Sequence, residues 1–319
     1  MTRACPSRRL VQALLAGLSL VAFHSAGAQN PSQAVDRAQL LRAQPTLREE
    51  PTDDDTGTDD THAVASPNDP DLGEQAILKR AENYRAFTVY ASAPISYTSN
   101  VALTRTGEQS DVLFTPSVGA SYAPRITSTL YGNISIGQQF FHYDKFSELD
   151  FGSFDVRAGL TYILPRLHNL LLRADYGYNR LTSDGYEEFF SNHSLNFAAE
   201  LPFRIGRAQQ VSIGTDINVS IASSPDEPAR HDLSPFVAYS VNVTRDLTMA
   251  AVGRLAVREY VEGDRTDVSG IFAVSASYRF NKWLSANAIS TFATSDSNQD
   301  AFDYDVFNLG LALSVAAKF

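Results

Sequence analysis

The last thirteen residues of the chain alternate between two kinds of side chain. From Phe307 to Phe319 every odd-numbered residue is apolar, and the even-numbered residues are Asn, Gly, Ala, Ser, Ala and Lys. Successive side chains of a β-strand point to opposite faces, so this pattern predicts a strand with one apolar face and one polar or small face. A strand of a soluble sandwich can alternate in the same way, but it rarely runs this long or ends a protein on an exposed Phe.

This terminal strand resembles the C-terminal strand of Gram-negative outer-membrane β-barrel proteins. In that family the terminal Phe and the alternating apolar residues form the signal that the barrel-assembly machinery reads. The resemblance implies that Phe319 belongs to an assembly signal and that the machinery is a partner. Ala317 departs from the pattern, because the family often carries an aromatic residue there.

The same alternation recurs from Phe87 to the end of the chain, and we expect twelve strands. They span residues 87–98, 111–123, 127–143, 151–163, 169–182, 190–203, 209–222, 232–244, 247–260, 267–280, 283–295 and 304–319. In the fourth strand, for example, Phe154, Val156 and Leu160 share one face, whereas Asp155 and Arg157 share the other.

The connections between these strands fall into two alternating classes. After even-numbered strands they are tight, as at Gly206-Arg207, and after odd-numbered strands they are mostly longer and acidic, as at residues 183–188. Outer-membrane barrels have short periplasmic turns and longer external loops. The sequence therefore predicts an all-β, antiparallel, up-and-down transmembrane β-barrel over residues 87–319, with the N- and C-termini in the periplasm.

The predicted polar faces favour a membrane barrel over a soluble sandwich. They are dominated by Ser, Asn, Gly, Ala and Thr, which suit a narrow barrel interior in which side chains share space. Aromatic residues near the strand ends suit the two membrane interfaces. These aromatic residues are Tyr97, Phe114, Tyr122, Phe140, Phe154, Tyr162, Tyr239, Phe280 and Phe319. The mean hydropathy of −0.18 agrees, because barrel strands turn alternate residues away from lipid.

Residues 1–28 have the organisation of a secretory signal peptide. Arginines at positions 3, 8 and 9 precede an apolar run from Leu10 to Phe23, and Ala26-Gly27-Ala28 forms a small-residue cleavage site. The only cysteine, Cys5, lies in this leader. We therefore expect a mature chain without disulfides or cysteine chemistry.

Two further segments precede the barrel. Residues 29–71 are rich in Asp, Pro, Thr, Ser and Gln, and we expect a disordered, acidic periplasmic linker that cannot bury enough surface to offset its ordering entropy. Residues 72–86 are expected to form a short helix, because Asp71 and Glu74 have the spacing of a capping box. This helix lies in the periplasm or enters the barrel as a plug.

No motif in the chain indicates catalysis, a cofactor or a bound metal. Outer-membrane phospholipase A carries a His-x-Ser-Asn-Gly motif, but here His193 and Ser194 are adjacent, and no Gly follows Asn196. Adjacent residues of a strand point to opposite faces, so this pair cannot act together. His142 near Asp144 favours a solvated loop histidine over a catalytic pair. We expect no enzymatic activity and no cofactor.

Charged residues on the predicted polar faces are the candidate functional residues. The predicted lumen-lining residues are Asp155, Arg157, Arg173, Asp175, Glu200, Asp216, Arg254, Arg258 and Arg279. The first four lie on neighbouring strands, so they can form a ladder of opposite charges. Such a ladder either selects solutes by charge at a constriction or holds the barrel together as a paired network.

The layout resembles that of outer-membrane β-barrel porins, which implies a channel for small hydrophilic solutes or ions. The alternative is a non-conducting structural or accessory barrel of an envelope-assembly or polysaccharide-export system, with a periplasmic partner bound through residues 29–86. The expected surroundings are outer-membrane lipid and lipopolysaccharide. The net charge of −10 argues against nucleic acid as a partner.

Overall fold

The computed structural model describes residues 31–42, 85–184, 186–206 and 208–319. The predicted signal peptide at 1–28 and residues 72–84 of the predicted helix lie outside the described residues. Within the described ranges, no helix combines the length and the apolar character needed to cross a membrane.

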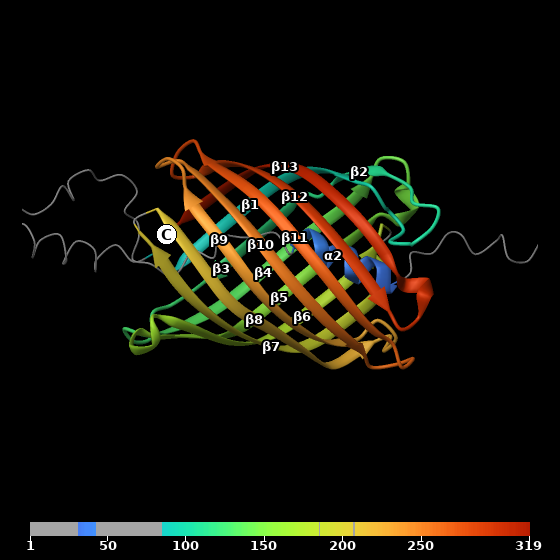
Figure 1. Ribbon diagram of the computed structural model, residues 1–319, viewed down its shortest axis with the longest axis horizontal. Coiled ribbons are helices and arrows are strands. Elements are labelled where there is room, and N and C mark those ends of the chain that lie inside the picture. The colour runs from blue at the N-terminus through green and yellow to red at the C-terminus, as the bar shows by residue number, and fades with distance from the viewer. Residues whose placement is uncertain (1–30, 43–84, 185, 207) are drawn as a thin grey trace, which may run out of the picture.

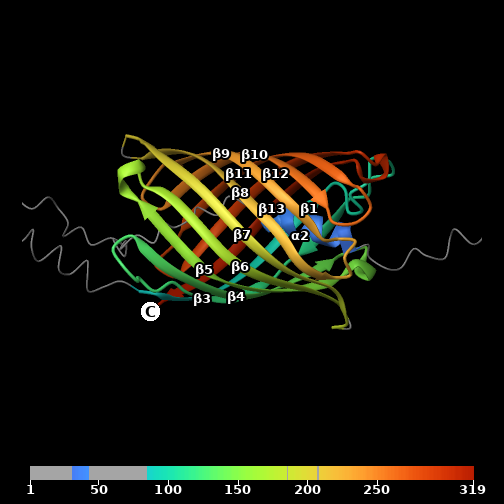
Figure 2. The ribbon, with the colours of Figure 1, turned by 90° about the horizontal axis from the view of Figure 1, so that it is seen from below.

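The described strands form one antiparallel sheet that closes on itself, because β13 pairs with β1 (Figures 1 and 2). The strands are β1 (Phe87–Thr98), β2 (Asp111–Phe114), β3 (Ser117–Tyr122), β4 (Leu130–Tyr143), β5 (Phe151–Leu164), β6 (Leu170–Ser183), β7 (Glu188–Ile205), β8 (Gln209–Ser224), β9 (Arg230–Asn242), β10 (Leu247–Tyr260), β11 (Thr266–Arg279), β12 (Leu284–Ser297) and β13 (Tyr304–Lys318). The helical elements are α2 (Pro31–Arg42) and the single 3-10 turns η2 (Ser147–Leu149), η3 (Pro165–Leu167) and η4 (Asp300–Phe302).

Strands β2 and β3 are two halves of one barrel strand. Both pair with β1 on one side and with β4 on the other, and Thr115-Pro116 separates them. Proline has no N–H to donate to a neighbouring strand, so the ladder is interrupted there. The barrel therefore has twelve strands around its circumference, and the predicted fold class and strand number are confirmed.

The two ends of the barrel differ, as the connection lengths predict. The long-loop end carries residues 99–110, 144–150, 184–187, 225–229, 261–265 and 298–303. The short-turn end carries the tight turns and the closure of the sheet. There Phe319 N–H donates to Phe87 O at 2.8 Å, and Phe87 N–H donates to Phe319 O at 3.2 Å. Closure leaves the sheet without an unpaired edge, which hydrocarbon would not tolerate.

The apolar face of the sheet points outward. On β13, Leu309, Leu311 and Leu313 are 52%, 68% and 57% exposed, whereas Asn308 is buried in the interior. The predicted aromatic residues also face outward, in two groups. Tyr97, Phe114, Phe140 and Phe154 lie toward the long-loop end, and Tyr122, Tyr162, Tyr239, Phe280 and Phe319 lie toward the short-turn end. This arrangement matches the two interfaces of a membrane, so the barrel is a transmembrane one.

The prediction of a disordered linker is wrong for residues 31–42. They form α2, which lies inside the barrel toward the long-loop end (Figures 1 and 2). Pro31 stands at the start of the helix, where its missing N–H costs nothing. Composition argued for disorder because the segment has little apolar surface to bury against itself. The interior wall of the barrel supplies the packing partner that the segment lacks.

A charge on the outward face tests the membrane-spanning fold. Leu311→Arg should cost about 2–4 kcal/mol of folding free energy, because Leu311 lies in the middle of β13 and faces hydrocarbon. Urea titration of the protein folded into lipid vesicles measures this cost. Glu108→Arg, which places the same side chain on an exposed loop, should leave the folding free energy unchanged. Equal effects of the two arginines would contradict the fold.

Candidate functional site

The barrel interior is divided between a helix at one end and a polar cavity toward the other. Two alanines of α2, Ala34 and Ala38, pack against an apolar patch on the inner wall of β2, β4, β5, β6 and β7. The patch consists of Leu113, Phe141, Tyr143, Phe151, Leu181 and Phe190, and Val101 of the first long loop extends it. Small helical side chains let the helix backbone approach the wall closely, so α2 fills the lumen at this level.

This apolar patch was missed at the sequence level, where the inward faces were expected to be polar or small. The sequence did contain a local signal for aromatic rings on the inward face. Phe140-Phe141 and Phe189-Phe190 are adjacent aromatic pairs, and neighbouring residues of a strand point to opposite faces. One ring of each pair must therefore point inward, and Phe141 and Phe190 are the two that do.

Arg37 ties α2 to the first long loop. Its guanidinium donates to Asn100 O at 2.8 Å, to Val101 O, and to Thr98 Oγ1 at 3.4 Å. The side chain of Asn100 in turn donates to Asp305 O at 2.9 Å, so the loop is itself held to the start of β13. Because all these groups are buried, the contacts fix the position of the helix in the barrel.

Asp36, on the same helix, faces three buried arginines, which we call the arginine cluster: Arg230, Arg258 and Arg265. Arg230 Nη1 lies 2.5 Å from Asp36 Oδ1, Arg258 Nη1 lies 3.8 Å from the same oxygen, and Arg265 Nη2 lies 4.0 Å from Oδ2. Only Arg258 was among the predicted inward-facing residues. Arg230 and Arg265 were missed because they stand at the ends of strands, where the alternating pattern stops.

The arginine cluster is neutralised by three carboxylates. Two come from the wall: Asp232 lies 3.0 Å from Arg230 Nε, and Asp267 accepts from Arg265 Nε at 2.9 Å and from Nη2 at 2.5 Å. Asp36 is the third. Burial alone would raise the pKa of the Asp36 carboxyl, but the charges of the three arginines outweigh it and hold that pKa below its ordinary value. Asp36 is therefore ionised at neutral pH.

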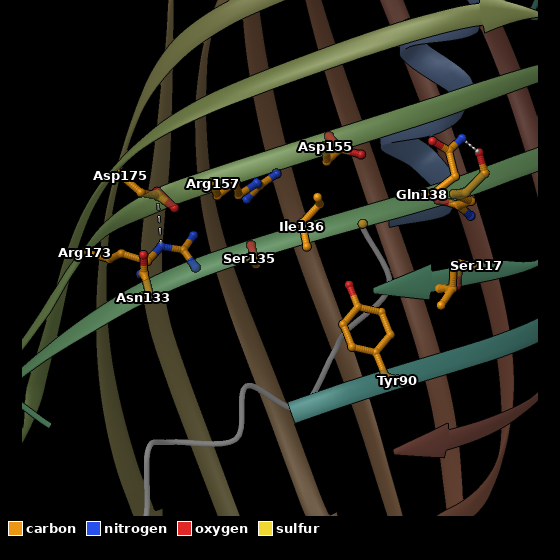
Figure 3. Close-up of a pocket in the computed structure, with 13 residues that line it drawn as sticks. Tyr90, Ser117, Asn133, Ser135, Ile136, Gln138, Asp155, Arg157, Arg173 and Asp175 are labelled. Carbon is orange, nitrogen blue, oxygen red and sulfur yellow. Dashed lines mark hydrogen bonds and ion pairs between the residues drawn. The ribbon is translucent and has the colours of Figure 1, made fainter. Parts of the chain in front are cut away.

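A polar cavity of ≈ 400 Å³ lies on the inner wall of β1, β3, β4, β5 and β6 (Figure 3). Four of the predicted lumen residues line it: Asp155, Arg157, Arg173 and Asp175. The hydroxyl, amide and phenol groups of the lining come from Tyr90, Ser117, Asn133, Ser135, Gln138 and Gln139. The cavity therefore offers hydrogen-bonding groups of every kind together with charges of both signs.

The charged residues of this cavity differ in their partners. Arg173 Nε lies 3.6 Å from Asp175 Oδ2, which is an ion pair between two members of the predicted ladder. Asp155 accepts from Asn179 Nδ2 at 2.9 Å. The side chain of Arg157 forms no hydrogen bond or ion pair with any described residue, and it is exposed to the cavity. A guanidinium in this situation is available to a solute.

Two aromatic rings inside the barrel lie over glycines. A Cβ added to Gly119 would stand 2.4 Å from Tyr90 Oη, and one added to Gly214 would stand 2.5 Å from Phe236 Cζ. Because glycine has no Cβ, each ring can occupy the space above the glycine backbone. The Phe236 ring in turn lies 5.2 Å from the guanidinium carbon of Arg254, whose Nη1 lies 3.0 Å from Asp216 Oδ2. Arg254 and Asp216, both predicted to face the lumen, are therefore paired.

The last two predicted lumen residues have different positions. Glu200 is partly buried on the inner side of β7. Arg279 ends β11 at the short-turn end, where it donates to Arg245 O at 3.0 Å and lies 4.0 Å from Asp246. Half of the Arg279 side chain is exposed. It lies at the rim of the barrel, in contact with the turn between β9 and β10.

His193 agrees with the prediction from the sequence, whereas His142, expected to be a solvated loop residue, lies on β4 and has a carboxylate partner. His193 contacts the outward-facing Tyr176 through its Nδ1, at 2.5 Å from the phenol oxygen, whereas Ser194 is buried in the interior beside Asn196. The two therefore point to opposite faces of β7. His142 pairs with Asp150 at 3.1 Å near the long-loop end, with its ring partly exposed. Among the described residues, no group of three or more His, Cys, Asp or Glu side chains has the arrangement of a metal site.

Known structures show the same fold. The crystal structure of the COG4313 outer membrane channel from Pseudomonas putida F1 matches with a TM-score of 0.53 and 11% identity, over 73% of this chain and 96% of that one. The translocator domain of the autotransporter NalP from Neisseria meningitidis matches with a TM-score of 0.42 and 10% identity, over 78% and 96%. The KdgM porin matches with a TM-score of 0.39 and 8% identity, over 70% and 97%.

No family model matches the chain, and no curated protein sequence does. The likeness in structure therefore establishes the fold alone. The chain has the fold of outer-membrane β-barrel proteins, as its terminal strand predicted.

A cysteine placed on α2 tests whether the contacts of Arg37 hold the helix. The single cysteine of the chain, Cys5, lies in the predicted leader, so Ala34→Cys in a chain that begins at Gln29 gives a unique thiol at a position that is 0% exposed. We expect a membrane-impermeant maleimide to label it slowly. Adding Arg37→Ala removes the bonds to Thr98, Asn100 and Val101 and should accelerate labelling several-fold. Thr106→Cys, on an exposed loop, should react equally fast with or without Arg37→Ala. Slow labelling in both helix variants would show that Arg37 does not anchor α2.

Proposed function

We propose that the protein is an outer-membrane channel for small hydrophilic solutes or ions, and that α2 closes it in the state described. The observation that carries this proposal is the unequal filling of the lumen. A separate helix occupies the long-loop end, whereas the wall of β1 and β3–β6 encloses a polar cavity with an unpartnered guanidinium, that of Arg157.

The size of the barrel supports a channel. Side chains alone just fill the interior of an eight-stranded barrel, whereas barrels of sixteen or more strands leave an aqueous channel. Twelve strands fall between these cases, and the extra width at the long-loop end is taken up by α2. Because residues 43–84 alone connect α2 to the barrel wall covalently, the helix can leave without breaking the sheet.

We place the long loops outside the cell and the short turns, with Phe319, in the periplasm. Loop lengths support this orientation, because outer-membrane barrels have short periplasmic turns and long external loops. In this orientation α2 closes the external end of the channel. The acidic long loops then face lipopolysaccharide, whose phosphates they can approach through bridging divalent cations.

The second candidate is a non-conducting structural or accessory barrel of the envelope, in which α2 is a permanent plug. The neutral, buried cluster around Asp36 favours it, since separating buried charge pairs is costly. A periplasmic partner bound through residues 29–86 belongs to this alternative. Such a partner would have to compete with the barrel for residues 31–42, because those residues are already packed inside it.

Deleting the helix separates the two functions. In planar bilayers the refolded mature chain should show rare, brief openings, and the chain lacking residues 31–42 should conduct continuously with a several-fold larger mean current. The physical reason is that α2 fills the lumen beside the apolar patch. Deleting residues 106–108 of the first long loop is the comparison, since these residues are exposed and the deletion leaves Asn100 and Val101, which bind Arg37, in place. A helix-deleted barrel that folds but carries no current would overturn the channel proposal.

The charge of the polar cavity should set the ion preference. In the helix-deleted chain, Arg157→Glu should shift the reversal potential in a potassium chloride gradient toward cation preference, because it replaces an available positive charge with a negative one. Arg166→Glu, the same change on the exposed turn η3, should have a much smaller effect. Equal shifts for the two variants would mean that the cavity does not line the conducting path.

A further inference from the structure

The arginine cluster depends on the helix for part of its charge balance. Asp232 and Asp267 belong to the wall, and each lies within 3.0 Å of its own arginine. Asp36 is the only carboxylate that α2 brings to the cluster. When the helix leaves, three guanidinium groups remain with two carboxylates, and the cluster acquires a net positive charge.

Arg258 is the member of the cluster without a wall carboxylate within ion-pairing distance. Its Nη1 donates to Ser269 Oγ at 2.8 Å, which is a neutral partner. Among the described residues, Asp36 is the only carboxylate within ion-pairing distance of Arg258. Without the helix, Arg258 keeps Asp232 and Asp267 opposite it on the neighbouring strands, but no carboxylate of the described residues lies within ion-pairing distance of it.

We infer that the arginine cluster is a carboxylate-binding site of the channel, and that Asp36 occupies it in place of a solute. The solutes are then small organic anions, and their binding competes with the docking of α2. This inference rests on the proposed channel function and adds to it the class of solute and the means of opening.

The wall holds the cluster in place independently of the helix. Arg265 is fixed by Asp267, and its guanidinium carbon lies 3.6 Å from the centre of the Phe302 ring and 4.1 Å from that of Tyr260. Arg230 donates to the Tyr260 hydroxyl at 2.8 Å. Because these contacts come from β9–β11 and η4, the site stays preorganised when α2 leaves. Arginine is suited to it, since its planar group can bind a carboxylate with two parallel hydrogen bonds.

The unpartnered Arg157 extends this site along the barrel. It lines the polar cavity from β5 (Figure 3). A carboxylate released from the arginine cluster would meet this second guanidinium among amide and hydroxyl groups. Two separated positive sites allow an anion to be bound without being trapped, as conduction requires.

The coupling between solute and helix follows from mass action. A ligand that binds the released state and not the docked state shifts the equilibrium toward release as its concentration rises. Asp36→Asn retains the size of the side chain but removes its charge. It should therefore raise the open probability in the absence of any carboxylate, because the arginine cluster no longer attracts the helix.

The experiment uses sodium succinate as the carboxylate probe and sodium chloride at equal ionic strength as its control. For the mature chain in planar bilayers, the open probability should rise with succinate to a plateau and stay low in chloride. For the chain lacking residues 31–42, succinate should reduce the chloride current by occupying the site. Arg258→Gln in the deleted chain should weaken this block by roughly tenfold or more.

Two further variants guard against misfolding and nonspecific effects. Arg258→Lys retains the charge but loses the planar fork, so its block by succinate should fall between those of the parent and Arg258→Gln. Arg279→Gln, which changes an arginine at the rim, should leave the block unchanged. Block that weakens from the helix-deleted parent to Arg258→Lys and then to Arg258→Gln supports the inference. Equal block by succinate in all three proteins overturns it.

The remaining outcomes separate this inference from the proposed function. A helix-deleted chain that conducts but prefers cations, or that succinate does not block, overturns the carboxylate site and leaves the channel in place. A folded helix-deleted chain that never conducts overturns both. Succinate block of the deleted chain without succinate-dependent opening of the full chain supports the site but overturns the competition with Asp36.

Discussion

The pairing of β1 with β13 is the constraint on which the other features depend. Hydrocarbon offers no hydrogen-bond partner to a backbone group, so a sheet in a membrane is stable only when it has no edge. The register from Thr88 opposite Lys318 to Thr98 opposite Asn308 closes the ring. Closure also decides, for every residue of every strand, whether its side chain meets lipid or the lumen. The chemistry of the interior is thus a consequence of strand register.

Features that depend on this two-residue period could be predicted from the sequence. The alternation from Phe307 to Phe319 predicts an outward apolar face, and the structure places Leu311 there and Asn308 inside. The same reasoning places Arg157 and Arg173 in the polar cavity. The two-residue alternation does not predict which way a side chain points where a strand ends, or where two adjacent residues are both large and apolar. Arg230 was missed for the first reason, and Phe141 for the second.

The helix could not be predicted in this way, because its stability comes from distant residues. Asp36 and Arg230 are 194 positions apart in the chain. Taken alone, residues 29–71 have the composition of a disordered segment, and a twelve-residue helix with alanines on its packed side is marginal in water. The barrel changes the balance by providing an apolar wall and three positive charges. Composition describes what a segment can bury against itself, and α2 is buried against another part of the chain.

The two halves of the interior follow opposite electrostatic rules. Around α2 the charged side chains are buried, and the arginines of the cluster are tolerated there because carboxylates lie beside them. In the polar cavity Arg157 needs no such partner, since its side chain is exposed. Under the proposed opening, removing α2 takes away the one carboxylate within ion-pairing distance of Arg258 and leaves it bonded to Ser269. In the channel that we propose, the Asp36 carboxylate stabilises the closed state, and its departure leaves the arginine cluster with a net positive charge. Under that proposal, closure and selectivity are two effects of one ion cluster.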